Sequence, residues 1–226
     1  GEDGRAEAYG SVHLYRLRDL PILWERFGKP TRQFMVYNQI RHPLSLVWSG
    51  YGEFQTLFRF DINELHWTLG KLLDTSRDFV FDLARRYDLM LGDYEVLAFL
   101  CACRVLGSLR LDIDAEAVVR QLPGADFRGH VQMEQITSDP ERFSAVFSGA
   151  TGLPVAVDDA YVQEVFATKA INKHRQDTKR LTPRQRWETL KDWQEDAFCH
   201  FLERFDLLPF YTEQGYEFDF IQACVA

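Results

Sequence analysis

The segment around residue 40 constrains the fold most strongly, because a buried strand runs directly into a helix start there. Residues 33–40, Gln-Phe-Met-Val-Tyr-Asn-Gln-Ile, form a mostly apolar run of strand length, which is typical of a strand buried on both faces of a parallel sheet. Pro43 suits the first turn of a helix, and apolar residues recur behind it at near-helical spacing. Ligands of parallel sheets bind beyond the carboxyl ends of the strands, where helix N-termini point at them. The junction from Ile40 to Pro43 is therefore the first candidate site.

Other periodic segments extend this pattern to an α/β protein. The further predicted elements are a strand at 10–17, a helix at 21–27, helices within 65–83 and 94–106, a strand at 130–136, helices from 139 and over 158–166, and one long helix from 183 to 205 behind a Thr182–Gln185 capping box. This order predicts a short parallel sheet flanked by helices in a helix-rich fold. No linker divides the chain, so residues 1–226 are expected to form a single domain.

Composition excludes several classes of protein. A net charge of −8 argues against a nucleic-acid binder, since affinity for a phosphate backbone is built from clustered Lys and Arg. No apolar run reaches the length of a membrane span, and no basic segment with an apolar stretch opens the sequence, so a soluble chain is expected. The oligomeric state is not indicated.

The four cysteines bear on the compartment. Cys101 and Cys103 lie in an apolar, helical segment and are interpreted as buried free thiols, which favours a reducing, cytoplasmic compartment. Cys199 and Cys224 could instead form a disulfide, in which case a soluble luminal domain with a removed anchor is the alternative.

Arg41 and Ser49 form a candidate phosphate-binding pair at the strand-to-helix junction. Arg41 follows the predicted strand directly, and Ser49 lies eight residues further along, inside the predicted helix. A cation at the strand end, a hydroxyl about two turns along the helix and free backbone donors at its start can converge on one phosphate. By itself this spacing also fits a solvated arginine and a neutral helix serine.

Three sequence blocks in order resemble sulfotransferases that use 3′-phosphoadenosine 5′-phosphosulfate (PAPS). The segment 41–51, with Arg41, Pro43, Ser49 and Tyr51, is similar to the strand-to-helix element that binds the 3′-phosphate in that family. Residues 131–154, with Asp-Pro-Glu and Gly-Leu-Pro, resemble the family's late strand-loop-helix, which identifies a fold and not a catalyst. Residues 170–175, Ala-Ile-Asn-Lys-His-Arg, are similar to a basic loop that folds over the nucleotide.

The resemblance implies a P-loop-nucleotide-hydrolase-like sulfotransferase fold and transfer of a sulfuryl group from PAPS to an acceptor hydroxyl or amine. Adenosine 3′,5′-bisphosphate is the implied product, and a small molecule or a glycan is the implied acceptor. His13, on the predicted strand at 10–17, resembles the family's catalytic His or acid and is the expected base. The expected contacts to PAPS are Arg41, Ser49, Lys169, Asn172, Lys173 and Arg175.

The remaining histidines are not expected to carry chemistry. His42 is interpreted as a family variant of a polar residue. The others have no mutual metal-ligand spacing, so no metal is expected; they are His66, His130, His174 and His200.

The sequence departs from the family in one respect that affects function. The family's first strand ends in a glycine-rich loop with Lys and Ser or Thr, which binds the 5′-phosphosulfate and supplies a cation to the leaving group. No such element occurs in the 226 residues. The alternative is therefore a binding or assembly protein with the sulfotransferase fold and no catalysis. A P-loop kinase relative is disfavoured, since neither a Walker lysine nor an acidic strand end for magnesium is present.

Overall fold

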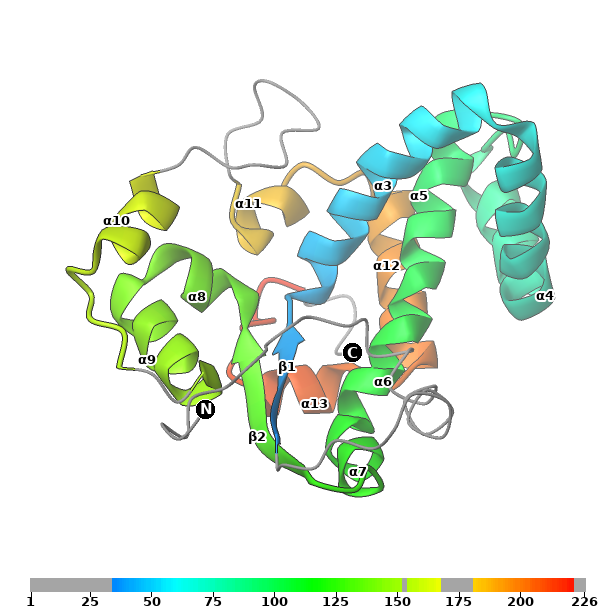
Figure 1. The fold of residues 1–226 in the computed structure, drawn as a ribbon. Helices are drawn as coiled ribbons and strands as arrows, with labels where there is room; N and C mark the ends of the chain where they lie inside the picture. Colours follow the sequence, from blue (N-terminus) through cyan, green and yellow to red (C-terminus); the bar gives the residue numbers. More distant parts are fainter. Residues whose placement is uncertain (1–33, 152–153, 168–180, 222–226) are drawn as a thin grey trace. The chain divides into compact units, whose positions relative to one another are not determined.

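The structure, a computed structural model, describes residues 34–151, 154–167 and 181–221. It is helix-rich, 69% helical, with a small parallel sheet of two strands, which confirms the predicted α/β class (Figure 1). The chain divides into two compact units, Gly1–Arg41 with Leu111–Thr178 and His42–Arg110 with Lys179–Ala226, and each is described by itself. The single-domain expectation stays a prediction, and the predicted strand at 10–17 and helix at 21–27 lie outside the described residues.

The first unit contains the sheet. Strand β1 (Phe34–Ile40) pairs in parallel with β2 (Ala125–Gln132), and the register shifts between Val36 and Asn38 of β1. Over that interval β2 advances one residue more than β1, which makes a bulge, and Gly129 adopts the positive φ of 100° there. The bulge sets which β2 side chain stands opposite Asn38.

Short helices flank these strands in the first unit. They are α6 (Arg110–Ile113, whose first residue belongs to the second unit), α7 (Ala115–Arg120), α8 (Met133–Ser138), α9 (Pro140–Thr151) and α10 (Ala160–Ala167). Val119 and Leu122 form a small core at α7, against Val36 and Phe127 of the strands. On the other face of β1, α9 approaches so closely that a Cβ at Gly149 would lie 2.5 Å from the Tyr37 hydroxyl.

Three predicted elements of this unit can be compared with the structure. The strand predicted at 130–136 is wrong in its bounds, because β2 ends at Gln132 and residues 133–138 form α8. The helix predicted from Asp139 is confirmed, since the Asp139 carboxylate accepts hydrogen bonds from the amides of Glu141 and Arg142 at 2.9 and 3.1 Å. The helix predicted at 158–166 corresponds to α10.

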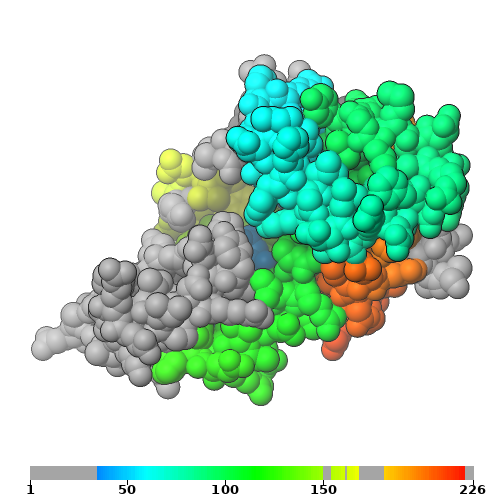
Figure 2. Space-filling view, turned by 90° about the vertical axis from the view of Figure 1, so that its right-hand side faces the viewer, coloured from blue at the N-terminus to red at the C-terminus, as the bar shows by residue number. Residues whose placement is uncertain are grey.

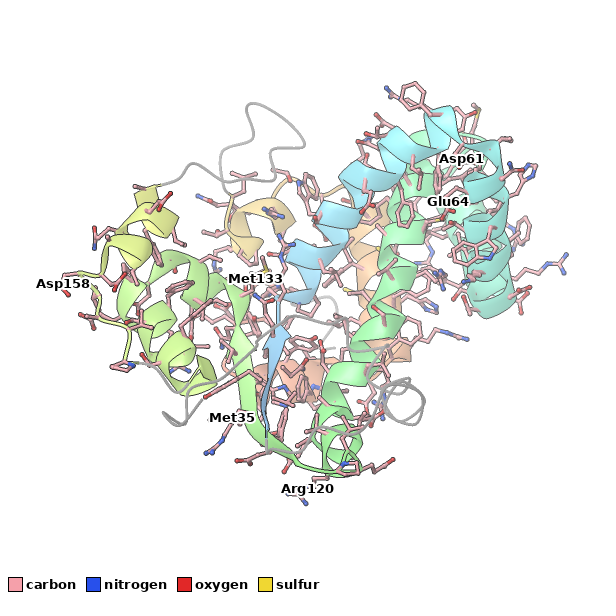
Figure 3. All side chains as sticks on the ribbon, in the orientation of Figure 1. Met35, Asp61, Glu64, Arg120, Met133 and Asp158 are labelled. Atoms are coloured by element: carbon pink, nitrogen blue, oxygen red, sulfur yellow. The ribbon has the colours of Figure 1, made fainter. Side chains whose placement is uncertain are left out.

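The second unit is built from helices alone among its described residues. They are α3 (Pro43–Phe60), α4 (Ile62–Tyr87), α5 (Tyr94–Val105), the 3₁₀ turn η1 (Leu106–Leu109), α11 (Pro183–Trp187), α12 (Asp192–Arg204) and α13 (Leu208–Glu213). Asp61 lies between α3 and α4 (Figure 3). Its carboxylate caps α4 by accepting hydrogen bonds from the amides of Asn63 and Glu64. Every residue of α5 from Val96 to Cys103 is buried, so this helix forms the centre of the unit. Many side chains of α4 are exposed to solvent (Figure 2).

The long helix predicted from 183 to 205 is wrong, because two helices occupy this range. The predicted Thr182–Gln185 capping box is present and starts α11. Helix α11 ends at Trp187, where the Thr189 hydroxyl donates to the Arg186 carbonyl at 2.7 Å and competes with continued helical bonding. Helix α12 then starts at Asp192, where the side-chain oxygen of Gln194 accepts a hydrogen bond from the Lys191 amide at 2.9 Å.

The cysteines follow the sequence expectation in part. Cys101 and Cys103 are buried free thiols, as predicted, and burial raises the pKa of Cys101 to about 12. Cys199 on α12 is disulfide-bonded, and Cys224, the partner named by the alternative prediction, lies outside the described residues. No helix in the described ranges is long and apolar enough to cross a membrane.

Candidate functional site

The structure describes two of the candidate ligand residues, Arg41 between β1 and α3 and Ser49 within α3. Strand β1 ends at Ile40, and only Arg41 and His42 separate it from Pro43, the first residue of α3. The strand is fixed by pairing with β2, and the helix starts where His42 caps it and Pro43 supplies a helical φ at no cost in hydrogen bonds. The predicted order of strand, arginine and helix start is thus confirmed, whereas the predicted burial of the strand on both faces is wrong, because Met35 and Gln39 are exposed.

Arg41 lies immediately beyond the carboxyl end of β1. Its side chain is half-buried, and no ion pair to it exists among the residues that the structure describes. A guanidinium keeps its charge at all physiological pH values and presents five donors. Arg41 is therefore a cation without a carboxylate partner in the described part of the chain, which suits an anionic ligand.

Ser49 lies on α3, six residues after Pro43. Its side chain is exposed and makes no hydrogen bond within the described ranges. Arg41 ends the first of the two segments of the first unit and Ser49 belongs to the second unit, so each is placed within its own unit. Tyr51, the other residue of this block, packs its ring against Trp48 and Phe99 at 5.9 and 5.4 Å and so serves the core of the second unit.

The start of α3 offers fewer free backbone donors than the sequence suggested. Pro43 has no N–H, and the amide of Leu44 donates to Nδ1 of His42 at 3.1 Å. Pro43, Leu44 and Ser45 are all buried. A phosphate beyond the end of β1 would therefore rely on side-chain donors such as the Arg41 guanidinium more than on the helix N-terminus.

His42 has a structural role that the sequence did not predict. Its ring is 2% exposed and both ring nitrogens have backbone partners, Leu44 N–H at Nδ1 and the Glu217 carbonyl at 3.4 Å from Nε2. Burial, with Arg186 as a further contributor, lowers the pKa of His42 to about 4. His42 is therefore neutral at physiological pH and serves as the cap of α3.

A buried polar cluster lies near the carboxyl ends of both strands of the first unit. Asn38 of β1 donates both amide hydrogens, one to the Asp112 carboxylate at 3.1 Å and one to Nδ1 of His130 on β2 at 3.1 Å. Desolvation lowers the pKa of His130, and its Nδ1 must be unprotonated to accept this bond. The cluster ties β1, β2 and α6 together. The sequence signal for it was Asn38, an amide side chain on a mostly apolar strand.

The other predicted site residues lie outside the described residues. These are the expected base His13 and the basic-loop residues Lys169, Asn172, Lys173 and Arg175. Their roles stay predictions. In the described ranges, no three His, Cys, Asp or Glu side chains gather in a way that could hold a metal ion.

No protein-family model matches the chain, and neither the curated proteins nor the solved structures include a significant match to it.

Proposed function

We propose that the chain is a sulfotransferase that moves a sulfuryl group from PAPS to an acceptor hydroxyl or amine, with a P-loop-type sulfotransferase fold. In this reaction the acceptor oxygen or nitrogen forms a bond to sulfur. The bond between sulfur and the bridging oxygen of the 5′-phosphate breaks, and that oxygen keeps the electron pair as adenosine 3′,5′-bisphosphate leaves. The acceptor's proton passes to a general base, a role proposed for His13.

The observation that carries the proposal is Arg41 at the end of β1. An arginine without a carboxylate partner in the described ranges directly follows a parallel strand and directly precedes the cap of a long helix. Arg41 and the exposed hydroxyl of Ser49 are proposed to bind the 3′-phosphate by charge-assisted hydrogen bonds. Lys169, Asn172, Lys173 and Arg175 are proposed to add donors to the same phosphate, with a small molecule or a glycan as acceptor.

The second candidate function is nucleotide binding without transfer. It is favoured by the lack of any Gly-Lys-Ser or Gly-Thr-Thr element in the 226 residues, because such a loop would supply the cation for the leaving group. Both candidates share the proposed contact between Arg41 and the 3′-phosphate. They differ in whether the bond to sulfur is broken.

Thermal unfolding with adenosine 3′,5′-bisphosphate tests the shared contact. At about 100 times its Kd, a ligand of the folded state stabilises by about 2.7 kcal/mol, which corresponds to about 5–10 °C in Tm for a chain of this size. We expect this shift for the wild type and its loss in Arg41→Ala. Arg128→Ala is the matched control, since Arg128 is in the same unit and pairs only with the neighbouring exposed Asp126 among the described residues.

Adenosine 5′-monophosphate, which lacks the 3′-phosphate, should shift Tm less than the bisphosphate does, and Arg41→Ala should remove the difference. A wild type that is not stabilised by adenosine 3′,5′-bisphosphate would overturn the nucleotide site. Incubation with PAPS and a panel of phenols, alcohols, amines and sugars separates the two candidates. Release of adenosine 3′,5′-bisphosphate that depends on an acceptor supports the enzyme, and binding without release supports the second candidate.

The compartment is part of the same proposal. A cytoplasmic location was predicted from the free thiols, whereas the disulfide at Cys199 favours the luminal alternative. Thiol counting on the protein from its native source, with and without reductant, decides between them. Two reactive thiols in the unfolded, unreduced chain indicate an oxidising compartment, and four indicate a reducing one.

A further inference from the structure

The C-terminal strap, defined as residues 216–221, runs along His42 in the second unit. Its aromatic rings surround the imidazole, with Tyr216 edge-on at 5.5 Å and Phe218 and Phe220 stacked at 4.9 and 6.1 Å. The strap leaves α13 through a Schellman motif, in which Gly215 has a φ of 83° and the Tyr216 amide donates to the Tyr211 carbonyl at 3.0 Å. The turn at the end of α13 therefore directs the strap toward the imidazole of His42.

Helix α11 holds the far end of the strap. Arg184 pairs with Asp219 at 2.6 Å and lies over the ring of Phe220 at 5.3 Å, and Trp187 also contacts that ring at 6.3 Å. These three α11 contacts are an exposed ion pair, a cation–π contact and ring packing, and none of them involves a histidine. Among the described residues, His42 is the histidine that contacts the strap.

The hydrogen bonds of His42 require a neutral ring. Nδ1 accepts from the Leu44 amide, so the proton of the neutral imidazole is on Nε2, which donates to the Glu217 carbonyl in the strap. A second proton would go on Nδ1 and would face the Leu44 N–H, donor against donor. It would also put a positive charge at the positive end of the α3 dipole, inside a buried site.

Among the described residues, Arg186 is a charged group that opposes a positive charge on His42. Arg186 on α11 is positive, Arg184 is engaged by Asp219, and Arg41 precedes His42 in the chain. The Glu217 side chain is exposed, and the strap's contact to His42 from this residue is its carbonyl. Burial and Arg186 thus oppose protonation of the ring in place, the hydrogen bond to the Glu217 carbonyl partly offsets them, and the pKa of His42 is lowered in balance.

We propose that the C-terminal strap is a proton-controlled latch, which is closed against the start of α3 while His42 is neutral and is released when His42 takes up a proton. The direction of the pH dependence follows from the pKa of His42 with the strap closed and with the strap open. The pKa is about 4 with the strap closed, and in the open state it is the ordinary 6.5 or so. Closure is therefore fully favoured above about pH 6.5, weakens as pH falls, and stops weakening below about pH 4. Between pH 7 and pH 5 the opening equilibrium should rise about 20-fold.

Hydrogen exchange on the full chain tests the latch. Protection factors of the strap amides and of the Leu44 amide, corrected for the intrinsic effect of pH, are expected to fall about 20-fold from pH 7 to pH 5. Amides in the middle of α5, where every residue from Val96 to Cys103 is buried, should keep their protection, so release of the strap is distinguished from unfolding of the unit.

Two variants and one direct measurement complete the test. His42→Asn keeps an oxygen that can cap α3 but cannot titrate or stack, so its strap should be poorly protected at pH 7 and insensitive to pH. His66→Asn, which changes an exposed histidine on α4, should retain the wild-type pH dependence. A change of less than threefold in the wild-type strap overturns the latch. Should His42→Asn not fold, NMR titration of wild-type His42 decides, because a pKa near 6.5 in the folded protein also overturns it.

Discussion

Gly107 in η1 provides a sharp test of the packing in the second unit. A Cβ placed on Gly107 would lie 2.9, 3.1 and 3.3 Å from three ring carbons of Phe205, the residue that ends α12. Three short contacts on one ring require the aromatic side chain or the backbone to move. Overpacking of this kind costs about 2–3 kcal/mol, and replacing glycine in a helical segment returns about 1 kcal/mol. We therefore expect Gly107→Ala to destabilise the protein by about 1–2 kcal/mol.

Gly70→Ala is the matched control, because Gly70 is on α4 and nothing lies within 4 Å of the added Cβ. The same chemical change should stabilise the protein by about 1 kcal/mol there. Thermal unfolding followed by tryptophan fluorescence reports on this unit, which holds Trp48, Trp67, Trp187 and Trp193. The expected shifts in Tm are a fall of about 3–6 °C for Gly107→Ala and a rise of about 2–4 °C for Gly70→Ala.

The source of the cost can be tested separately. In a Phe205→Leu background the ring carbons are gone, so adding Gly107→Ala should be neutral or stabilising. A Gly107→Ala variant as stable as Gly70→Ala, or a destabilisation that persists in the Phe205→Leu background, would refute the reasoning about this contact.

Three further substitutions probe other parts of the chain, each read by urea unfolding. Asn38→Leu leaves the buried carboxylate of Asp112 without its amide donor and should destabilise by about 1–3 kcal/mol, more than the exposed Gln39→Leu beside it. Asp88→Gly should stabilise by about 0.5–1 kcal/mol, because residue 88 ends α4 with a φ of 50° that glycine adopts freely; an unchanged or lower midpoint would contradict this. Asp139→Ala removes the cap of α9 and should cost about 1 kcal/mol, a loss that Asp139→Asn should largely avoid.

Local signals predicted the elements that local interactions determine. Pro43 marks the start of α3 because its fixed φ and missing N–H suit the first helical turn only. Asp139 and Thr182 mark the starts of α9 and α11 because their side chains bind amides two or three residues ahead. Both partners of each of these contacts lie within one helical turn in the sequence, so the starts of these helices could be predicted from neighbouring residues alone.

Elements that depend on distant partners could not be predicted in this way. The bonding of His42 is not visible in its neighbours, since its Nε2 partner is Glu217, 175 residues away. The bounds of β2 follow from its pairing with β1, because the pairs run from Phe34 with Ala125 to Ile40 with Gln132. The candidate site shows the same division, because the position of Arg41 was evident from the strand before it, whereas the occupied amide of Leu44 was not.

The occupied start of α3 changes how a nucleotide site at this junction would work. Helix N-terminal amides bind phosphate through a fixed backbone, whereas Arg41 would bind through its side chain, so binding is sensitive to a single substitution there. The 3′-phosphate is unchanged during sulfuryl transfer, and contacts to it hold the ground state and the transition state equally. Such contacts set affinity and not rate. Acceleration has to come from a cation at the bridging oxygen and a base at the acceptor. Nucleotide binding and sulfuryl transfer are therefore separable properties, carried by different residues, and the two candidate functions differ only in the second.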